Sequence, residues 1–333
     1  MLLVATDARF EAHEPGRGHP ERPERLRAVM QGLHAGAEKD AIRPLAARSA
    51  TRDELERVHA AAYLERLEQF CAAGGGHLDA DTAASAASWA AALLAAGAGL
   101  EAVDALERGD GDAAFCAVRP PGHHAVAARA MGFCLLNNVA VTAAALRDRG
   151  ERVLIVDWDA HHGNGTQDIF FTDPAVLYVS MHEWPLYPGT GRLDDVGAGR
   201  GTGCNVNFPL PAGATGDVYL DAIDTVVAPV ADRFDPTWVL ISAGFDAHRA
   251  DPLTGLDLSA GDYADLTARV LALAPARRCI VFLEGGYDLD ALRDSTAATV
   301  STLLGAPVRP EAATAHGPGR TVVHAARDLH QLV

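Results

Sequence analysis

The chain has 333 residues, of which 49 % are apolar, and a formal net charge of −16. This length and apolar content suffice for one large α/β domain with a sizeable core. The strong negative charge argues against a surface that binds nucleic acid or anionic membrane.

The cysteines and the apolar runs bear on the compartment. Five cysteines are scattered without a CxxC pair, at Cys71, Cys116, Cys134, Cys204 and Cys279. The N-terminus also lacks the pattern of a secretory signal, so we expect a cytoplasmic protein with free thiols. No uninterrupted apolar run reaches the roughly 18 residues of a membrane helix. Residues 83–107 come closest, but Ser, Glu and Asp interrupt them.

Short, apolar, β-branched runs recur along the chain and predict strands. They lie at residues 2–6, 113–118, 152–159, 175–182, 204–210, 238–246 and 279–287. Runs that are apolar on both faces are typical of parallel strands covered by helices. Helical patterns separate many of these strands, at residues 52–71, 83–108, 137–149, 217–233, 260–273 and 288–304.

This alternation predicts a single α/β domain with a mostly parallel central sheet flanked by helices. We find no internal repeat and no long linker. We therefore expect one domain over residues 1–305. Residues 306–333 are richer in Pro, Gly and His. They are expected to form a C-terminal appendage packed on the same domain.

Polar side chains stand where several predicted strands end. Asp157 and Asp159 end one strand, His182 ends the next, Asp246 follows "LISAGF", and Tyr287 follows "FLEGG". Because ligands bind at the carboxyl ends of strands in open α/β sheets, these residues are expected to meet around one site.

The stretch "DWDAHHG" predicts a metal site. Asp159 and His161 are two residues apart, so in an extended segment their side chains point the same way. A carboxylate and an imidazole are zinc ligands, and a catalytic zinc keeps one position for water. Asp246 is the best third ligand. An isolated DxH is most often a cap and a loop histidine, but the crowding of acids here favours the metal site.

A second histidine pair, His123 and His124, follows a stiff Pro-Pro-Gly turn in "RPPGHHA". Neutral imidazoles pack poorly in an apolar core but transfer protons well near pH 7. We therefore expect the pair to take part in acid–base chemistry.

Six ordered motifs together resemble the zinc-dependent histone deacetylases and their bacterial relatives, which include acetylpolyamine amidohydrolases. The motifs are "RPPGHHA", "GFCLLNNVA", "VDWDAHHGNG", "YPGTG", "SAGFDAHRADP" and "EGGYDL", and "HPERPERL" at residues 19–26 also fits. The resemblance covers roughly residues 7–305. It implies an arginase/deacetylase-like α/β fold, one catalytic divalent metal, and hydrolysis of an N-acetyl or related acyl amide.

The resemblance also implies roles for single residues. The metal ligands would be Asp159, His161 and Asp246, with Zn²⁺ as the ion and Fe²⁺ as an alternative. The catalytic group would comprise His123, His124, Tyr287, Asp157 and Asn164. A structural K⁺ would be held by Asp157, Asp159, His161, Ser180 and Met181. The substrate channel would be formed by Gly132, Phe133, Tyr187 and Gly286, with Asp79 at its rim.

In the implied mechanism, His124 is the general base and acid, and Asp157 orients His123. Tyr287 stabilises the oxyanion. Residue 164 is Asn where some relatives carry Asp, so His124 should lose its proton more easily here. In this respect the chain resembles class II relatives.

The sequence disfavours two other functions. An arginase-type ureohydrolase would need a further carboxylate where the chain has Gly163. An acyl-amine binding protein without turnover would have no use for the filled catalytic positions. The sequence leaves open whether the substrate is a peptide acyl-lysine, an acetylpolyamine or another small amide, and it leaves the oligomeric state open.

Overall fold

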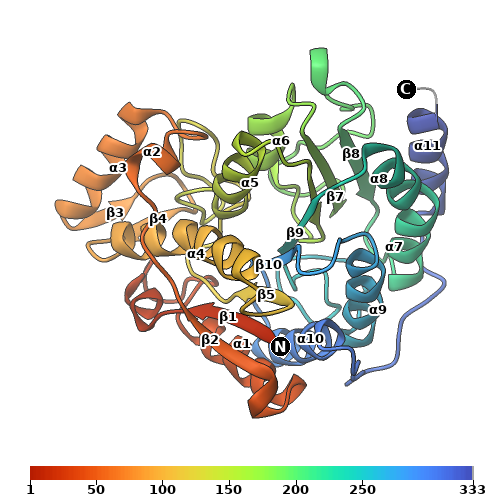
Figure 1. The fold of residues 1–333 in the computed structure, drawn as a ribbon, viewed down its shortest axis with the longest axis horizontal. Helices are drawn as coiled ribbons and strands as arrows, with labels where there is room; N and C mark the ends of the chain where they lie inside the picture. The colour runs from red at the N-terminus through yellow and green to blue at the C-terminus, as the bar shows by residue number, and fades with distance from the viewer. Residues whose placement is uncertain (332–333) are drawn as a thin grey trace.

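The computed structural model describes residues 1–331. Its centre is an eight-stranded sheet in which every pairing is parallel, in the order β2-β1-β5-β10-β9-β6-β7-β8 (Figure 1). The strands are β1 Leu2–Thr6, β2 Ile42–Ala46, β5 Ala113–Cys116, β6 Val153–Asp157, β7 Val176–Glu183, β8 Asn205–Leu210, β9 Trp238–Ala243 and β10 Cys279–Leu283. A two-stranded antiparallel ribbon joins β3 Gly75–His77 to β4 Ala83–Ser85. The predicted fold class, a parallel α/β sheet, is confirmed.

Helices cover both faces of the sheet (Figure 1). Helices α4 and α5 pack on one face, whereas α1, α9 and α10 pack together on the other. The α-helices are α1 Glu24–Gly36, α2 Arg52–Leu55, α3 Ala61–Ala72, α4 Ser88–Arg108, α5 Asn138–Asp148, α6 Asn164–Phe170, α7 Gly216–Ala222, α8 Ala228–Phe234, α9 Ala260–Leu271, α10 Leu289–Leu303 and α11 Arg320–Gln331. A π-helical turn, Ile223–Val227, joins α7 to α8.

The central strands are buried on both faces, which explains their composition. Every residue of β6, β9 and β10 is buried. Such strands need apolar side chains in both directions, and β-branched residues fit the pleated surface well. The strand order then brings the carboxyl ends of β5, β10, β9 and β6 next to one another, although residues 116 and 283 are far apart in sequence.

Several elements differ from the sequence prediction. The edge strand β2 was not predicted, because its residues are half-exposed and include Pro44. The helix expected over 52–71 is interrupted between α2 and α3, and the helix expected from residue 83 begins at Ser88 because residues 83–85 pair with β3. Helices α1, α6 and α11 were also missed.

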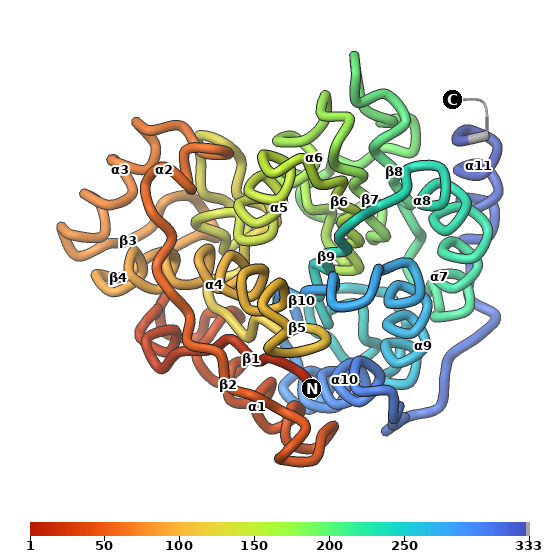
Figure 2. The backbone as a smooth tube through the Cα atoms, viewed as in Figure 1, coloured from red at the N-terminus to blue at the C-terminus, as the bar shows by residue number. Residues whose placement is uncertain are grey.

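The C-terminal residues return to the body of the protein (Figure 2). Helix α11 packs against β8 and α7. Before it, Glu311 accepts a hydrogen bond from Arg249 and lies 2.6 Å from the imidazole of His248. Helix α4 is long and apolar enough to cross a membrane, but 72 % of its most apolar window is buried inside the protein, as in a core helix.

Helix α4 approaches the sheet closely at Gly99. A Cβ atom at this position would lie 2.2 Å from the Thr142 hydroxyl of α5 and 2.5 Å from the ring of Phe282 on β10. We predict that Gly99→Ala lowers the free energy of unfolding by about 1–3 kcal/mol, because a packed core resists added volume. Urea unfolding measures the change. The exposed Ala90→Ser on the same helix should move stability by no more than about 0.5 kcal/mol. Equal midpoints for Gly99→Ala and the wild type would contradict this packing.

Candidate metal centre and active site

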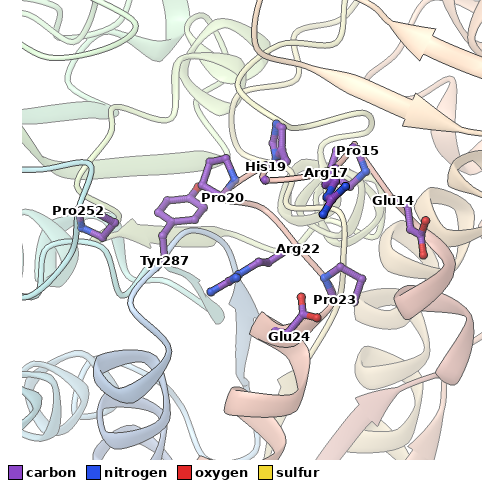
Figure 3. A pocket seen from close by; sticks show the side chains of 12 residues that line it. Glu14, Pro15, Arg17, His19, Pro20, Arg22, Pro23, Glu24, Pro252 and Tyr287 are labelled. Atoms are coloured by element: carbon purple, nitrogen blue, oxygen red, sulfur yellow. The ribbon is translucent and has the colours of Figure 1, made fainter.

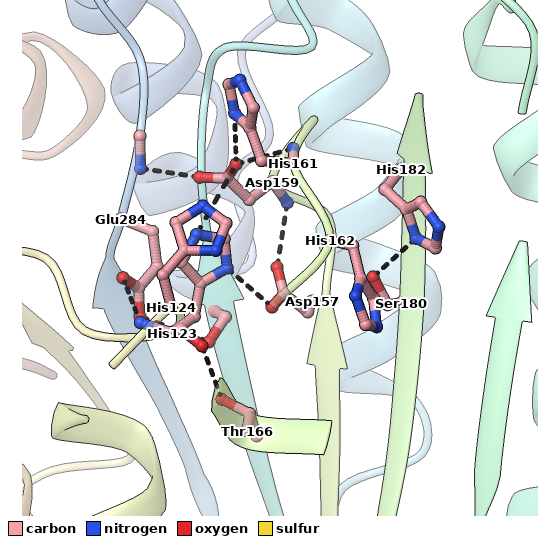
Figure 4. A network of polar contacts seen from close by, with 12 residues as sticks. His123, His124, Asp157, Asp159, His161, His162, Thr166, Ser180, His182 and Glu284 are labelled. Atoms are coloured by element: carbon pink, nitrogen blue, oxygen red, sulfur yellow. Dashed lines mark hydrogen bonds and ion pairs between the residues drawn. The ribbon is translucent and has the colours of Figure 1, made fainter. Parts of the chain in front are cut away.

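Two acids and one histidine meet at the carboxyl ends of β6 and β9. Asp159 and His161 follow β6, Asp246 follows β9, and one ligand atom from each lies within 4.8 Å of the others. The His161 Nδ1 atom is 3.0 Å from an oxygen of Asp246. It is 3.2 Å from an oxygen of Asp159 (Figure 4). Among residues 1–331 this is the one cluster of three or more such groups that could hold a metal ion.

The surroundings of these carboxylates suit a cation. The main-chain N–H of Ala160 donates to Asp246 at 2.8 Å, and that of Gly285 donates to Asp159 at 2.8 Å. Each bond fixes one oxygen of its carboxylate. Burial and the nearby charge of Asp159 raise the pKa of Asp246 to about 7. A bound cation would relieve this repulsion, so two carboxylates and one imidazole fit a divalent metal.

The tandem histidines lie beside this cluster and have different partners. His123 Nδ1 is 3.0 Å from a carboxylate oxygen of Asp157 (Figure 4). His124 Nδ1 is instead 2.8 Å from the amide oxygen of Asn164. Burial opposes a charge on His123, but Asp157 and Asp159 outweigh it and raise its pKa to about 10. Burial and the charges of His123 and His161 hold the pKa of His124 well below its ordinary value. At neutral pH, His124 is therefore the imidazole that can accept a proton.

Glu284, at the end of β10, holds the histidine loop and was not singled out from the sequence. One of its oxygens accepts the main-chain N–H of Gly122 at 2.6 Å and of His123 at 3.1 Å. Burial raises the pKa of Glu284 to about 7, against the effect of His123. Glu284 could have been found from the sequence as the first residue of the "EGGYDL" motif. The motif does not predict, however, which loop its carboxylate binds.

Tyr287 is held from two sides by residues that sequence reasoning also missed. Its main-chain N–H donates to Asp251 at 2.7 Å, and the guanidinium carbon of Arg25 lies 4.9 Å from the centre of its ring. Arg25 also donates to the carbonyl of Gly286 at 2.6 Å and to that of Glu284. Burial raises the pKa of Tyr287 well above its ordinary value, so the phenol stays protonated and can donate a hydrogen bond.

A cavity of about 230 Å³, called the central cavity below, leads to these groups. It is lined by Asp81, Pro121, His123, His124, Gly132, Phe133, Asp159, His161, Leu186, Tyr187, Leu253, Gly285 and Tyr287. The volume lies below the roughly 300–1,000 Å³ typical of small-molecule pockets, so the cavity suits a slender chain. Gly132 has a φ of 55°, and a Cβ there would lie 2.3 Å from the His124 ring. Only glycine therefore lets this wall approach the histidine.

Two residues assigned to the channel and rim, Gly286 and Asp79, are not among the residues that line the central cavity. The cavity is lined by Gly285 instead of Gly286, whose carbonyl faces Arg25. At the rim it is lined by Asp81 instead of Asp79. The Asp79 side chain is turned back onto the main chain, where it accepts the N–H of Asp81 at 3.1 Å and of Thr82 at 2.6 Å. An Asx turn of this kind withdraws the carboxylate from the cavity.

The residues expected to hold a monovalent cation lie at the ends of the neighbouring strands β6 and β7. Three of them have a protein partner for one polar atom. Asp157 accepts the hydroxyl of Tyr178 at 2.9 Å, and the Ser180 hydroxyl is 2.9 Å from a ring nitrogen of His182. The Tyr219 hydroxyl donates to the Met181 carbonyl at 3.5 Å. A cation at this place stays a prediction.

A second, wider cavity of about 620 Å³ shares Tyr287 with the central cavity (Figure 3). The loop of residues 14–24 forms one side of it and Pro252 the other. Its lining includes two arginines, Arg17 and Arg22, and two glutamates, Glu14 and Glu24, so its formal charges balance.

Several known proteins are similar to this chain in sequence and in fold. The sequence matches the histone deacetylase domain over residues 19–303. It is 42 % identical over 284 residues to a probable deacetylase of Archaeoglobus fulgidus, covering 84 % of this chain and 79 % of that one. It is 39 % identical over 276 residues to a histone deacetylase-like amidohydrolase of Pseudomonas aeruginosa, covering 81 % and 73 %.

Arabidopsis thaliana histone deacetylase 15 is 43 % identical over 293 residues, which are 86 % of this chain and 53 % of that protein. The crystal structure of the HDA15 HD domain superposes with a TM-score of 0.92 at 39 % sequence identity, covering 99 % of this chain and 94 % of that chain. With the site geometry above, these likenesses show that the chain belongs to the histone deacetylase family.

Proposed function

We propose that this hydrolase of the histone deacetylase family removes an acetyl or related acyl group from an amine on an aliphatic stem. The observation that carries the proposal is one juxtaposition. Two members of the buried Asp–His–Asp cluster, Asp159 and His161, line the same slender cavity as a neutral imidazole, His124, and a protonated phenol, Tyr287. An amide needs a better nucleophile than water and a stabilised oxyanion, and these groups can supply both.

Asp159, His161 and Asp246 would hold the metal, with Zn²⁺ or Fe²⁺ both compatible with their oxygen and nitrogen donors. When bound, a divalent cation polarises the amide carbonyl and lowers the pKa of a water molecule. The proposal keeps K⁺ as a structural cation between β6 and β7, supported by the oxygen-rich strand ends there.

His124 would take the proton of the attacking water and later give it to the leaving amine. The Asn164 carbonyl oxygen lies against Nδ1 of His124, so Nδ1 carries the hydrogen and Nε2 is free to accept. His123, charged beside Asp157, would contribute a fixed positive charge. The Tyr287 hydroxyl would donate to the oxyanion, and Phe133 and Tyr187 would form the walls beside the stem.

The substrate would be a peptide or small molecule with an acylated amine, hydrolysed in the cytoplasm. The five cysteines, all free, are compatible with that compartment. An arginase-type reaction is disfavoured because the cluster has three ligands and Gly163 offers no further carboxylate. Binding without turnover is the remaining alternative, and hydrolysis assays decide it.

The first prediction concerns the metal. Asp246→Ala removes one of three ligands, so the variant should lose the bound metal and all activity. Elemental analysis measures the metal after purification. Asp290→Ala is the matched control, because that carboxylate is 83 % exposed on α10. Full metal content in Asp246→Ala would sink the assignment.

The second prediction concerns pH. Asn164→Asp places a negative charge beside His124, which raises the pKa of that imidazole. The basic form of His124 is then lost at a higher pH as the solution is acidified, so the acidic limb of the pH–rate profile should move upward. Gln69→Glu adds the same charge on the exposed side of α3 and serves as control. An unmoved limb would mean that another group controls it.

The third prediction tests hydrolysis itself. A panel of acetyl-lysine peptides, acetylpolyamines and longer acyl-lysines, assayed with defined metal, should contain a substrate. On it, Tyr287→Phe should lower kcat by about 10²–10³ while the metal content stays unchanged. Tyr263→Phe is the matched control, because that buried hydroxyl has no hydrogen-bond partner among residues 1–331 and does not line the central cavity. Near-normal kcat in Tyr287→Phe would remove the phenol from the reaction, and a panel without any turnover would favour the binding protein.

A further inference from the structure

Arginines without an ionic partner gather near the central cavity. The chain carries 28 Lys and Arg residues, and Lys39 is the single lysine. Most arginines lie within 4.0 Å of a carboxylate, as expected in a chain of net charge −16. Within residues 1–331, six have no such partner, namely Arg17, Arg22, Arg66, Arg129, Arg200 and Arg233. Four of these six line the two cavities that flank the central cavity.

One of these flanking cavities has an unbalanced charge. It has a volume of about 310 Å³, is called the α3 cavity here, and is lined by Tyr63, Arg66, Leu67, Phe70, Leu78, Ala128, Arg129 and Ala130. Two guanidinium groups thus stand among apolar side chains, and no acid lines the cavity. The cavity beside residues 14–24 differs, because Glu14 and Glu24 balance its two arginines.

The acids near the α3 cavity are engaged or distant. On α3 itself, Glu65 accepts a hydrogen bond from Gln69, and Glu68 lies 3.7 Å from Arg52. Asp168 is close enough to Arg129 to have its pKa affected, yet it lies beyond 4.0 Å. The Arg129 guanidinium donates only to the sulfur of Met131, at 3.3 Å. Arg66 and Arg129 are both exposed. Because they also lack an acidic partner, their guanidinium groups are available to an anion.

The α3 cavity adjoins the central cavity through two shared wall segments. Leu78 and Asp81 belong to one turn, closed by the Leu78 N–H donating to the Thr82 carbonyl at 2.8 Å. Ala130 and Phe133 belong to the other, and the Phe133 N–H donates to the Thr82 hydroxyl at 3.1 Å. Each segment thus lines the α3 cavity at one end and the central cavity at the other. If one peptide occupied both cavities, its group in the α3 cavity would lie only a few peptide residues away from its amine in the central cavity.

We propose that the α3 cavity binds a carboxylate of the acylated substrate, with Arg66 and Arg129 as donors and the apolar walls against the adjoining chain. This inference rests on the proposed function and names its substrate class. The substrate is an acylated amine in an anionic molecule, and acetylpolyamines, which are cationic, are disfavoured. Guanidinium groups bind carboxylates through paired, planar hydrogen bonds, which suits them to this task. The carboxylate can come from an acidic residue of a peptide or from a small acylated amino acid.

The test uses the intact metal-loaded chain and matched peptides. Two acetyl-lysine peptides differ only in carrying Asp or Asn at the positions that flank the lysine. At low salt, the Asp peptide should have a kcat/KM about tenfold higher, from two exposed ion pairs. The double variant Arg66→Gln/Arg129→Gln should lose this preference and leave the Asn peptide unchanged. Arg200→Gln, another exposed arginine without a partner, should keep it. The same comparison is made with small molecules. Free Nε-acetyl-lysine, which carries a carboxylate, should have a higher kcat/KM than its carboxamide, and the double variant should lose this difference.

Binding gives a second readout that needs no turnover. Fluorescence anisotropy with a labelled Asp peptide should show weaker binding to the double variant, and added salt should weaken binding to the wild type. Arginine-dependent binding without hydrolysis of any amide would refute the proposed function and keep the anion site. Equal kcat/KM for the two peptides with equal binding by the double variant would overturn the inference, and so would a preference for acetylspermidine over every peptide.

Discussion

Asp159 and Asp246 lie buried next to each other, and two like charges out of water repel strongly. Groups around the two carboxylates partly offset this repulsion. Main-chain N–H groups that follow β6 and β10 each bind one carboxylate oxygen, and His161 lies against both acids. A side chain would not fit at residue 285, because a Cβ there would lie 2.3 Å from an oxygen of Asp246. Glycine therefore lets the main chain come close enough to donate its N–H. The remaining imbalance, seen in the pKa of about 7 for Asp246, is what a divalent cation would neutralise.

The two adjacent histidines differ because their neighbours differ. Asp157 and Asp159 favour the charged form of His123, and that charge in turn disfavours a charge on His124. Asn164 orients His124 without adding a negative charge. The two imidazoles thereby have pKa values shifted in opposite directions, and this difference depends on contacts of about 3 Å that join separate loops.

The loops around the site are tied to one another by their own polar groups. Glu284 joins the Tyr287 segment to the histidine loop, and Asp251 joins it to the segment after β9. These buried contacts hold together the loops that form the central cavity. The two cavities that flank it differ from each other in charge, because only one of them is lined by acids as well as arginines. Since a slender cavity excludes bulk near the amide, the flanks are where substrates that share an acyl-amine stem can be told apart.

The sequence by itself determined the fold class and the metal-ligand candidates. Buried parallel strands need runs that are apolar on both faces, and the spacing of Asp159 and His161 is a local feature that survives without tertiary knowledge. The resemblance carried by the motifs supplied the other candidates, including Tyr287 and the tandem histidines. Edge strand β2 was missed because its residues are half-exposed. Helix α1 was missed because polar residues, one of them the buried Arg25, interrupt the apolar face that it packs against α10.

Only the tertiary structure decided which neighbours of those candidates face the cavity. Asp81 lines it instead of Asp79 because the Asp79 carboxylate binds its own turn, and Gly285 lines it instead of Gly286 because Arg25 holds the Gly286 carbonyl outward. Glu284, Asp251 and Arg25 act on residues far away in sequence, so no local pattern reveals their partners. Side-chain direction in a loop follows from such long-range hydrogen bonds, and these exist only once the strands have brought the loops together.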